Sequence, residues 1–212
     1  MITIFVTGIG TDVGKTVVSA IIAEALQADY WKPVQAGFEQ GTDSDAVKDL
    51  LTNQKSVIHP SFYTFRLPAS PHIAARVENV RIDLEKIVEE YERINTGNEW
   101  LIVEGAGGLM VPLNEEKFAA DLIMKMRARV VIVSRNYLGS INHSLLTSKL
   151  LNQMGIVNAG WVFNDHFMDY EDEITHWSGY PKIGSIPFTD KPDARFVHEQ
   201  AQSLKTDLTR WL

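Results

Sequence analysis

Short apolar runs alternate along the chain with longer segments in which apolar residues recur at helical spacing. The apolar, β-branched runs occupy residues 2–7, 100–103, 130–134, 157–162 and, more weakly, 182–186. They lack the alternation of polar and apolar positions typical of a strand with one exposed face, which indicates strands covered on both faces, as in a parallel sheet. The helical patterns lie at residues 15–26, 44–51, 84–94, 118–126, 140–154 and 170–177. This order predicts an α/β fold with a doubly wound, mostly parallel sheet and helices on both faces.

The chain shows no internal repeat, low-complexity tract or linker that would divide it. At about 150 residues per domain, 212 residues fit one large domain better than two small ones. We therefore expect a single domain over residues 1–212. The loop-like segment 59–71, which contains three prolines, is long enough either to lie over a site or to cross the surface.

Charge and cysteine content exclude several classes of function. The 20 Lys and Arg residues against 27 Asp and Glu residues give a net charge of −7, and no basic cluster occurs, so we expect no nucleic-acid partner. The chain contains no cysteine, which excludes thiolate metal sites, disulfides and cysteine nucleophiles. No apolar run approaches the roughly 18 residues of a membrane span, and the N-terminus lacks the basic region of a signal peptide. We therefore expect a cytoplasmic protein with no membrane partner.

A glycine-rich loop joins the first predicted strand to the first predicted helix. Its sequence is Gly8-Ile-Gly-Thr-Asp-Val-Gly-Lys-Thr16. Such a loop exposes consecutive backbone N–H groups at the positive end of a helix dipole, where phosphates bind. In the usual pattern G-x-x-x-x-G-K-[ST], the lysine reaches the β- and γ-phosphates and the hydroxyl binds Mg²⁺, which are the roles expected of Lys15 and Thr16. Ile9 stands where the first glycine is usual, and the alternative is a tight turn with a capping lysine; the context nevertheless predicts a P-loop nucleoside triphosphatase fold.

Three further segments place charged side chains where such a sheet completes a nucleotide site, at the carboxyl ends of its strands. Lys32 follows a short apolar strand and is either a site lysine or a solvated one. Asp45 opens a helix, where the residues alone favour an acid that complements the helix dipole. Glu104 ends a buried strand and precedes three glycines in four residues, a context that favours a Mg²⁺ ligand over a buried ion pair.

Several motifs, taken together and in this order, resemble those of dethiobiotin synthetases. They are Phe5-Val-Thr-Gly8, Thr11, Val13-Gly-Lys-Thr16, Lys32-Pro-Val34, Ser44-Asp45, Pro71-His72, Val103-Glu-Gly-Ala-Gly-Gly108, Leu138-Gly139, Ile141-Asn-His143, Ala159-Gly-Trp-Val162 and Asn164-Asp165. Glu-Gly-Ala-Gly-Gly alone also occurs in cobyrinate amidotransferases, so the resemblance is specific because of the combination.

The resemblance implies a cytosolic, Mg²⁺-dependent homodimer of the biotin pathway. Such enzymes convert 7,8-diaminononanoate (diaminopelargonate), CO₂ and ATP into dethiobiotin, ADP and phosphate. One amine takes up CO₂ as a carbamate, the carbamate oxygen attacks the γ-phosphate, and the second amine closes a cyclic urea and expels phosphate. The implied partners are a small-molecule diamine and a second copy of the chain, with a substrate site shared across the interface.

The resemblance also implies roles for individual residues. Lys15 and Lys32 match the catalytic lysines that neutralise the phosphates and the carbamate, and the metal positions match Thr16, Asp45 and Glu104. The implied nucleotide-binding residues are Gly10, Thr11, Asp12, Val13, Gly14, Lys15, Thr16, Val17, Asn164 and Pro187. The implied substrate-binding residues are Lys32, Ala36, Gly105, Gly108, Leu138, Gly139, Ser140, Ile141 and Asn142.

Two departures and three rival functions qualify this interpretation. Ala36 stands where family members commonly carry a hydroxyl, and Ile9 where threonine is frequent, but neither change removes a charge or a metal ligand. A partitioning-type ATPase switch usually carries a second lysine early in the phosphate loop, which is absent here. An amidotransferase needs a cysteine nucleophile. A small-molecule kinase fits the phosphate loop alone and would not need CO₂.

Overall fold

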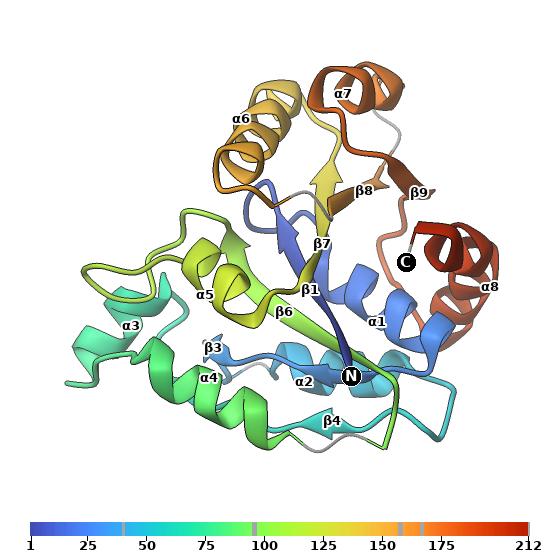
Figure 1. Ribbon diagram of the computed structural model, residues 1–212. Coiled ribbons are helices and arrows are strands. Elements are labelled where there is room, and N and C mark those ends of the chain that lie inside the picture. The colour runs from blue at the N-terminus through green and yellow to red at the C-terminus, as the bar shows by residue number, and fades with distance from the viewer. Residues whose placement is uncertain (40, 95–96, 157–158, 166–167, 212) are drawn as a thin grey trace.

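A seven-stranded sheet forms the centre of the molecule (Figure 1). The computed structural model describes residues 1–39, 41–94, 97–156, 159–165 and 168–211. Every pairing between neighbouring strands of this sheet is parallel. In spatial order the strands are β4 (Ile58–His59), β2 (Asp29–Trp31), β6 (Trp100–Gly108), β1 (Ile2–Gly8), β7 (Arg129–Arg135), β8 (Ala159–Asn164) and β9 (Lys182–Ile186).

Helices cover both faces of the sheet, which confirms the predicted doubly wound α/β fold. One face packs against α1 (Lys15–Leu26), α2 (Asp43–Leu50) and α8 (Ala194–Trp211), and the other against α4 (Leu84–Arg93), α5 (Ala119–Met126), α6 (Ser140–Gln153) and α7 (Glu171–Ser178). Figure 1 shows α1 and α8 together on one side of β1, with α5 on the other. No helix in the described part of the chain is long and apolar enough to cross a membrane.

The absence of polar alternation in the strands follows from this double cover. In β1, Ile4 and Val6 belong to the core under α1, whereas Phe5 belongs to the core on the opposite face, and all three are buried. Strand order reverses at β1, since the chain continues to β2 on one side and later crosses to β7 on the other. Ligands bind at such a switch point, outside the carboxyl ends of the strands, and the phosphate loop follows β1 there.

The structure corrects several predicted boundaries. The strand predicted at residues 100–103, β6 in the structure, continues through the glycines to Gly108, because it keeps pairing with β1. Segment 59–71, predicted as a loop, contains β5 (Tyr63–Phe65) and leads into α3 (Pro71–Val77), and β5 pairs with β3 (Val34–Ala36). Elements of three residues are too short to show a periodicity. Of the predicted strand 157–162, the first two residues lie outside the described part.

Candidate functional site

The phosphate loop folds around the ammonium group of Lys15. Lys15 Nζ donates to the carbonyl of Gly10 at 2.8 Å. Gly14, just before α1, has a φ of 93°, and a Cβ there would lie 2.2 Å from Asn164 Nδ2. Asn164 Nδ2 donates in turn to the carbonyl of Val13 at 3.0 Å, so the end of β8 is fastened to the loop. The loop therefore depends on glycine at position 14 for both conformation and space.

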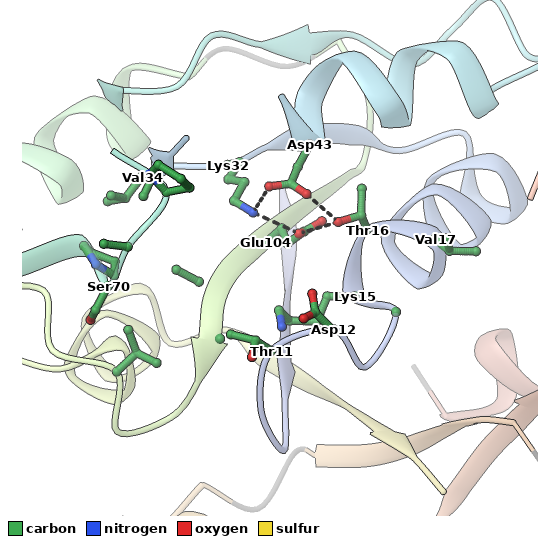
Figure 2. Close-up of a pocket in the computed structure, with 18 residues that line it drawn as sticks. Thr11, Asp12, Lys15, Thr16, Val17, Lys32, Val34, Asp43, Ser70 and Glu104 are labelled. Carbon is green, nitrogen blue, oxygen red and sulfur yellow. Dashed lines mark hydrogen bonds and ion pairs between the residues drawn. The ribbon is translucent and has the colours of Figure 1, made fainter. Parts of the chain in front are cut away.

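Next to the loop, four polar side chains from separate parts of the chain converge (Figure 2). Thr16 Oγ1, in the first turn of α1, lies 2.8 Å from Asp43 Oδ1 and 3.0 Å from Glu104 Oε1. Lys32, which follows β2, donates to Glu104 Oε1 at 3.2 Å and pairs with Asp43 Oδ2. Glu104 on β6 and Lys32 are both buried, so these charges compensate one another inside the protein.

Burial and neighbouring charge act on the two lysines in different proportions. Burial lowers the pKa of Lys15, and the charge of Glu104 opposes this only in part. Burial also acts to lower the pKa of Lys32, but the carboxylates of Glu104 and Asp43 outweigh it and raise this pKa above its usual value. The pKa of Asp43 is lowered, because Lys32 and the hydrogen bonds to the carboxylate outweigh the effect of burial. Lys32 thus stays cationic and Asp43 anionic at neutral pH.

A cavity of about 900 Å³ opens over this cluster. Lys15, Thr16 and Glu104 form its floor, and the segment Pro68–Pro71 with Val34 forms the opposite wall. Of the predicted site residues, the cavity brings together Thr11, Asp12, Gly14, Lys15, Thr16, Val17, Lys32, Ala36 and Glu104. Gly105 and Gly108 lie on β6 but do not line it, whereas Ala106 and Gly107 do. A Cβ at position 108 would lie 3.0 Å from the carbonyl of Gly8, so this glycine permits β6 to approach β1 closely.

The structure corrects the expected grouping of Asp45 with Thr16 and Glu104. Asp45 is the third residue of α2, and its Oδ2 accepts hydrogen bonds from Thr42 N at 3.0 Å and Thr42 Oγ1 at 2.7 Å. With Thr42 Oγ1 accepting from Asp45 N, the two residues form a capping box on the surface. Asp43, one residue after the cap, is the carboxylate that reaches Thr16 and Lys32. The acid at the helix start is therefore a cap, as the residues alone favour, and its neighbour at position 43 lies in the cavity.

The donor set fits Mg²⁺ as a hard cation. The hydroxyl of Thr16 and the carboxylates of Asp43 and Glu104 supply only oxygen atoms, which are the ligands that Mg²⁺ prefers. Mg²⁺ normally completes its coordination with water and phosphate oxygens. Among the described residues, no group of three or more His, Cys, Asp or Glu side chains is placed to hold a metal by itself.

A second cavity, of about 680 Å³, lies on the other side of the loop residues Thr11 and Asp12. Its further walls are Val13, segment 135–138, Asp165 and Phe188. The predicted substrate segment 138–142 begins here, at the start of α6, and not at the larger cavity. Leu138 is 90% exposed, Gly139 and Asn142 are exposed, and Pro187 lies exposed directly after β9. Within one chain, the start of α6 therefore does not line the cavity of Lys32 and Glu104.

Sequence reasoning missed Asp43, Tyr30 and the wall at 68–71. The pattern Thr42-x-x-Asp45 is a capping-box signature and would have assigned Asp45 to the cap. Tyr30 donates to Glu104 Oε2 at 3.0 Å from a fully buried position, and burial, with the charges of Glu104 and Asp43, raises the pKa of Tyr30 well above its usual value. No local signal marks Tyr30, because it stands next to another aromatic residue, Trp31, in a strand of only three residues.

Comparison with known proteins shows which family and which fold the chain is similar to. A family model described as an AAA domain matches residues 2–195. ATP-dependent dethiobiotin synthetase BioD of Christiangramia forsetii is 44% identical over 205 residues, which are 96% of this chain and 96% of the relative. The enzyme of the same name from Cytophaga hutchinsonii is 52% identical over 160 residues, 76% of this chain and 75% of the relative. Among solved structures, the Pyrococcus furiosus cell division ATPase MinD superposes with a TM-score of 0.64 and full coverage of both chains, but at 13% identity it supports the fold alone.

Proposed function

The chain belongs to the ATP-dependent dethiobiotin synthetase family, and on that premise we propose that the cavity over Lys15, Lys32 and Glu104 is where its reaction takes place. The activity is that of an ATP-dependent ligase of biotin biosynthesis, which closes the ring of dethiobiotin on diaminopelargonate. The observation that carries the assignment to this cavity is that two lysines from different elements face one space beside a phosphate loop.

The reaction needs three steps on the substrates and no protein nucleophile. An amine nitrogen bonds to CO₂ and loses a proton, which gives a carbamate. The carbamate oxygen then attacks the γ-phosphorus, ADP leaves, and a carbamic-phosphoric anhydride remains. The second amine attacks the carbamate carbon and gives up a proton, and phosphate leaves as the cyclic urea closes. Phosphoryl transfer of this kind depends chiefly on alignment and electrostatic stabilisation.

The two lysines divide the charge that must be neutralised. Lys15 is held in the phosphate loop by its bond to Gly10, and would contact the β- and γ-phosphates. Lys32 enters the cavity from a separate segment, directly after β2, and would face the carbamate as it approaches the γ-phosphate. Its raised pKa keeps the ammonium charged, so it can stabilise an anionic acceptor.

Mg²⁺ completes this proposal. Thr16, Asp43 and Glu104 would hold it together with phosphate oxygens, and it would neutralise charge that develops on the phosphates. Thr16 lies within hydrogen-bond distance of both carboxylates, so these protein oxygens already face one another. Lys32 neutralises the same carboxylates, and it is well placed to turn to the acceptor when the metal shares that charge.

We further propose that the acceptor site is completed by a second copy of the chain. The far end of the diamine substrate carries a carboxylate, yet Lys15 and Lys32 are the only cationic side chains among the described residues that line the cavity. Both lie at the phosphate end. The start of α6 has no side-chain cap and has open space at Gly139, so this helix N-terminus suits the carboxylate of a substrate bound in a neighbouring subunit.

The activity is tested by measuring phosphate release from ATP with diaminopelargonate, with and without bicarbonate. We expect release to require the diamine and bicarbonate, with dethiobiotin formed in equal amount. Transfer of phosphate to the diamine without bicarbonate would instead indicate a kinase. Hydrolysis of ATP that is independent of the diamine would indicate a nucleotide-controlled switch.

The shared site is tested by mixing two inactive variants, Lys15→Ala and Asn142→Asp, and allowing their subunits to exchange. Each mixed dimer regains one intact site, so activity is expected to recover to about a quarter of the wild-type value at equal mixing. Asn142→Asp is chosen because it places a negative charge beside the substrate carboxylate. Exchange that is confirmed by mass but restores no activity would show that each chain builds its site alone.

A further inference from the structure

Glu104 is held from two sides by donors of different origin. Its Oε1 accepts hydrogen bonds from Thr16 and Lys32, both of which line the cavity. Its Oε2 accepts a hydrogen bond of 3.0 Å from the phenol hydroxyl of Tyr30, which lies below the cavity floor. Tyr30 itself does not line the cavity and is fully buried.

The ring of Tyr30 is fixed by the packing of the sheet against two helices. On β2, it pairs in register with Ile58 of β4 and Ile102 of β6. It belongs to the core cluster that includes Ile22 of α1 and Val47 of α2. A phenol held in this way has little freedom, so the position of its hydroxyl is set by the core and not by the site.

We propose that Tyr30 is a positioning residue for metal binding, which orients the Glu104 carboxylate so that Oε1 faces the cavity. This inference rests on the proposed role of Glu104 as a ligand of nucleotide-bound Mg²⁺. Groups that hydrogen-bond a metal ligand from behind fix its orientation, and their loss typically weakens metal binding by about tenfold to a hundredfold. Without the phenol, Oε2 loses the hydrogen bond from Tyr30, and the carboxylate is free to rotate out of the orientation in which Oε1 faces the cavity.

Tyr30→Phe removes the hydroxyl and keeps the ring that the core needs. We expect the Mg²⁺ concentration for half-maximal activity to rise by about tenfold to a hundredfold, and high Mg²⁺ to restore most of the turnover. The same loss should appear without turnover, as weaker Mn²⁺ binding to the complex with ADP, measured by electron paramagnetic resonance. The affinity for ADP in the presence of a chelator should stay unchanged, because Tyr30 does not line the cavity.

Tyr180→Phe is the matched control. The Tyr180 hydroxyl is also buried and donates one hydrogen bond, to the carbonyl of Ile156 at 2.6 Å, far in the fold from Glu104. Both variants lose one buried phenol hydrogen bond and should lose comparable stability, but only Tyr30→Phe should change the Mg²⁺ dependence. If Tyr30→Phe does not fold, Tyr30→Met, which also lacks a donor, takes its place in the same measurements.

A double-variant cycle separates this inference from the proposed function. In a Glu104→Gln background, Tyr30→Phe should add no further change in Mn²⁺ binding, since the two residues act as one unit. If Glu104→Gln weakens Mn²⁺ binding but Tyr30→Phe behaves like Tyr180→Phe, the positioning role is wrong and the metal site stands. If Glu104→Gln itself leaves Mn²⁺ binding unchanged, the metal site is wrong.

Discussion

Replacement of Glu104 by glutamine is expected to lower turnover by about two orders of magnitude or more. The substitution keeps the shape of the side chain and removes its charge. A glutamine amide must direct its NH₂ group either at Tyr30 or at Thr16 and Lys32, all of which are donors to the present carboxylate. The substitution therefore removes a proposed metal ligand and also disturbs the hydrogen bonds of its neighbours. Steady-state turnover as a function of Mg²⁺ concentration measures both effects.

Glu24→Gln is the control for the loss of a buried carboxylate. Glu24 lies on α1 and accepts hydrogen bonds from Thr52, Asn53 and His198, and although burial opposes it, these bonds lower its pKa to about 2. Glu24 does not line the cavity over Lys15, Lys32 and Glu104. Glu24→Gln should therefore lower the melting temperature and leave turnover per folded molecule close to wild type. Near-normal turnover and unchanged Mg²⁺ dependence in Glu104→Gln would contradict the metal assignment.

Asparagine at position 43 is expected to lower turnover about a hundredfold, whereas asparagine at position 45 should leave it within about twofold. Asp43 contacts Thr16 and Lys32 in the cavity, so Asp43→Asn removes a proposed metal ligand and one counter-charge of Lys32. Asp45 faces outward in the capping box with Thr42, and an asparagine oxygen can still accept the Thr42 hydrogen bonds. Asp45→Asn should therefore give only a small decrease in melting temperature.

The pair of variants is informative because the two aspartates are only two residues apart on α2. Two residues correspond to more than half a helical turn, so their side chains point to different sides of the helix. Both turnover and the affinity for ADP with Mg²⁺, measured by calorimetry, should fall in Asp43→Asn and stay close to wild type in Asp45→Asn. A large loss in Asp45→Asn with normal turnover in Asp43→Asn would restore the assignment that the resemblance implies. It would also mean that α2 begins in a different register when nucleotide binds.

The two lysines show which site residues the local sequence can predict and which it cannot. The phosphate loop could be predicted because its strand, glycines and helix are consecutive in the chain, and the structure places Lys15 and Thr16 there as expected. For Lys32, the local sequence did not decide between a site residue and a solvated lysine. Its burial between Asp43 and Glu104 depends on a contact across 72 positions, which no local pattern contains.

The sequence by itself determined the α/β order, the doubly wound class and the residue types of the site, because periodicity, loop chemistry and the motif combination are local properties. The capping-box pattern in the sequence assigns Asp45 to the start of α2, but only the tertiary structure decided that Asp43 enters the cavity, because the packing of α2 on α1 sets the direction of this helix. The tertiary structure also decided that a buried phenol on β2 supports Glu104 on β6. Both results depend on the relative placement of elements that are distant in the chain, and hydrophobic packing of the whole sheet fixes that placement.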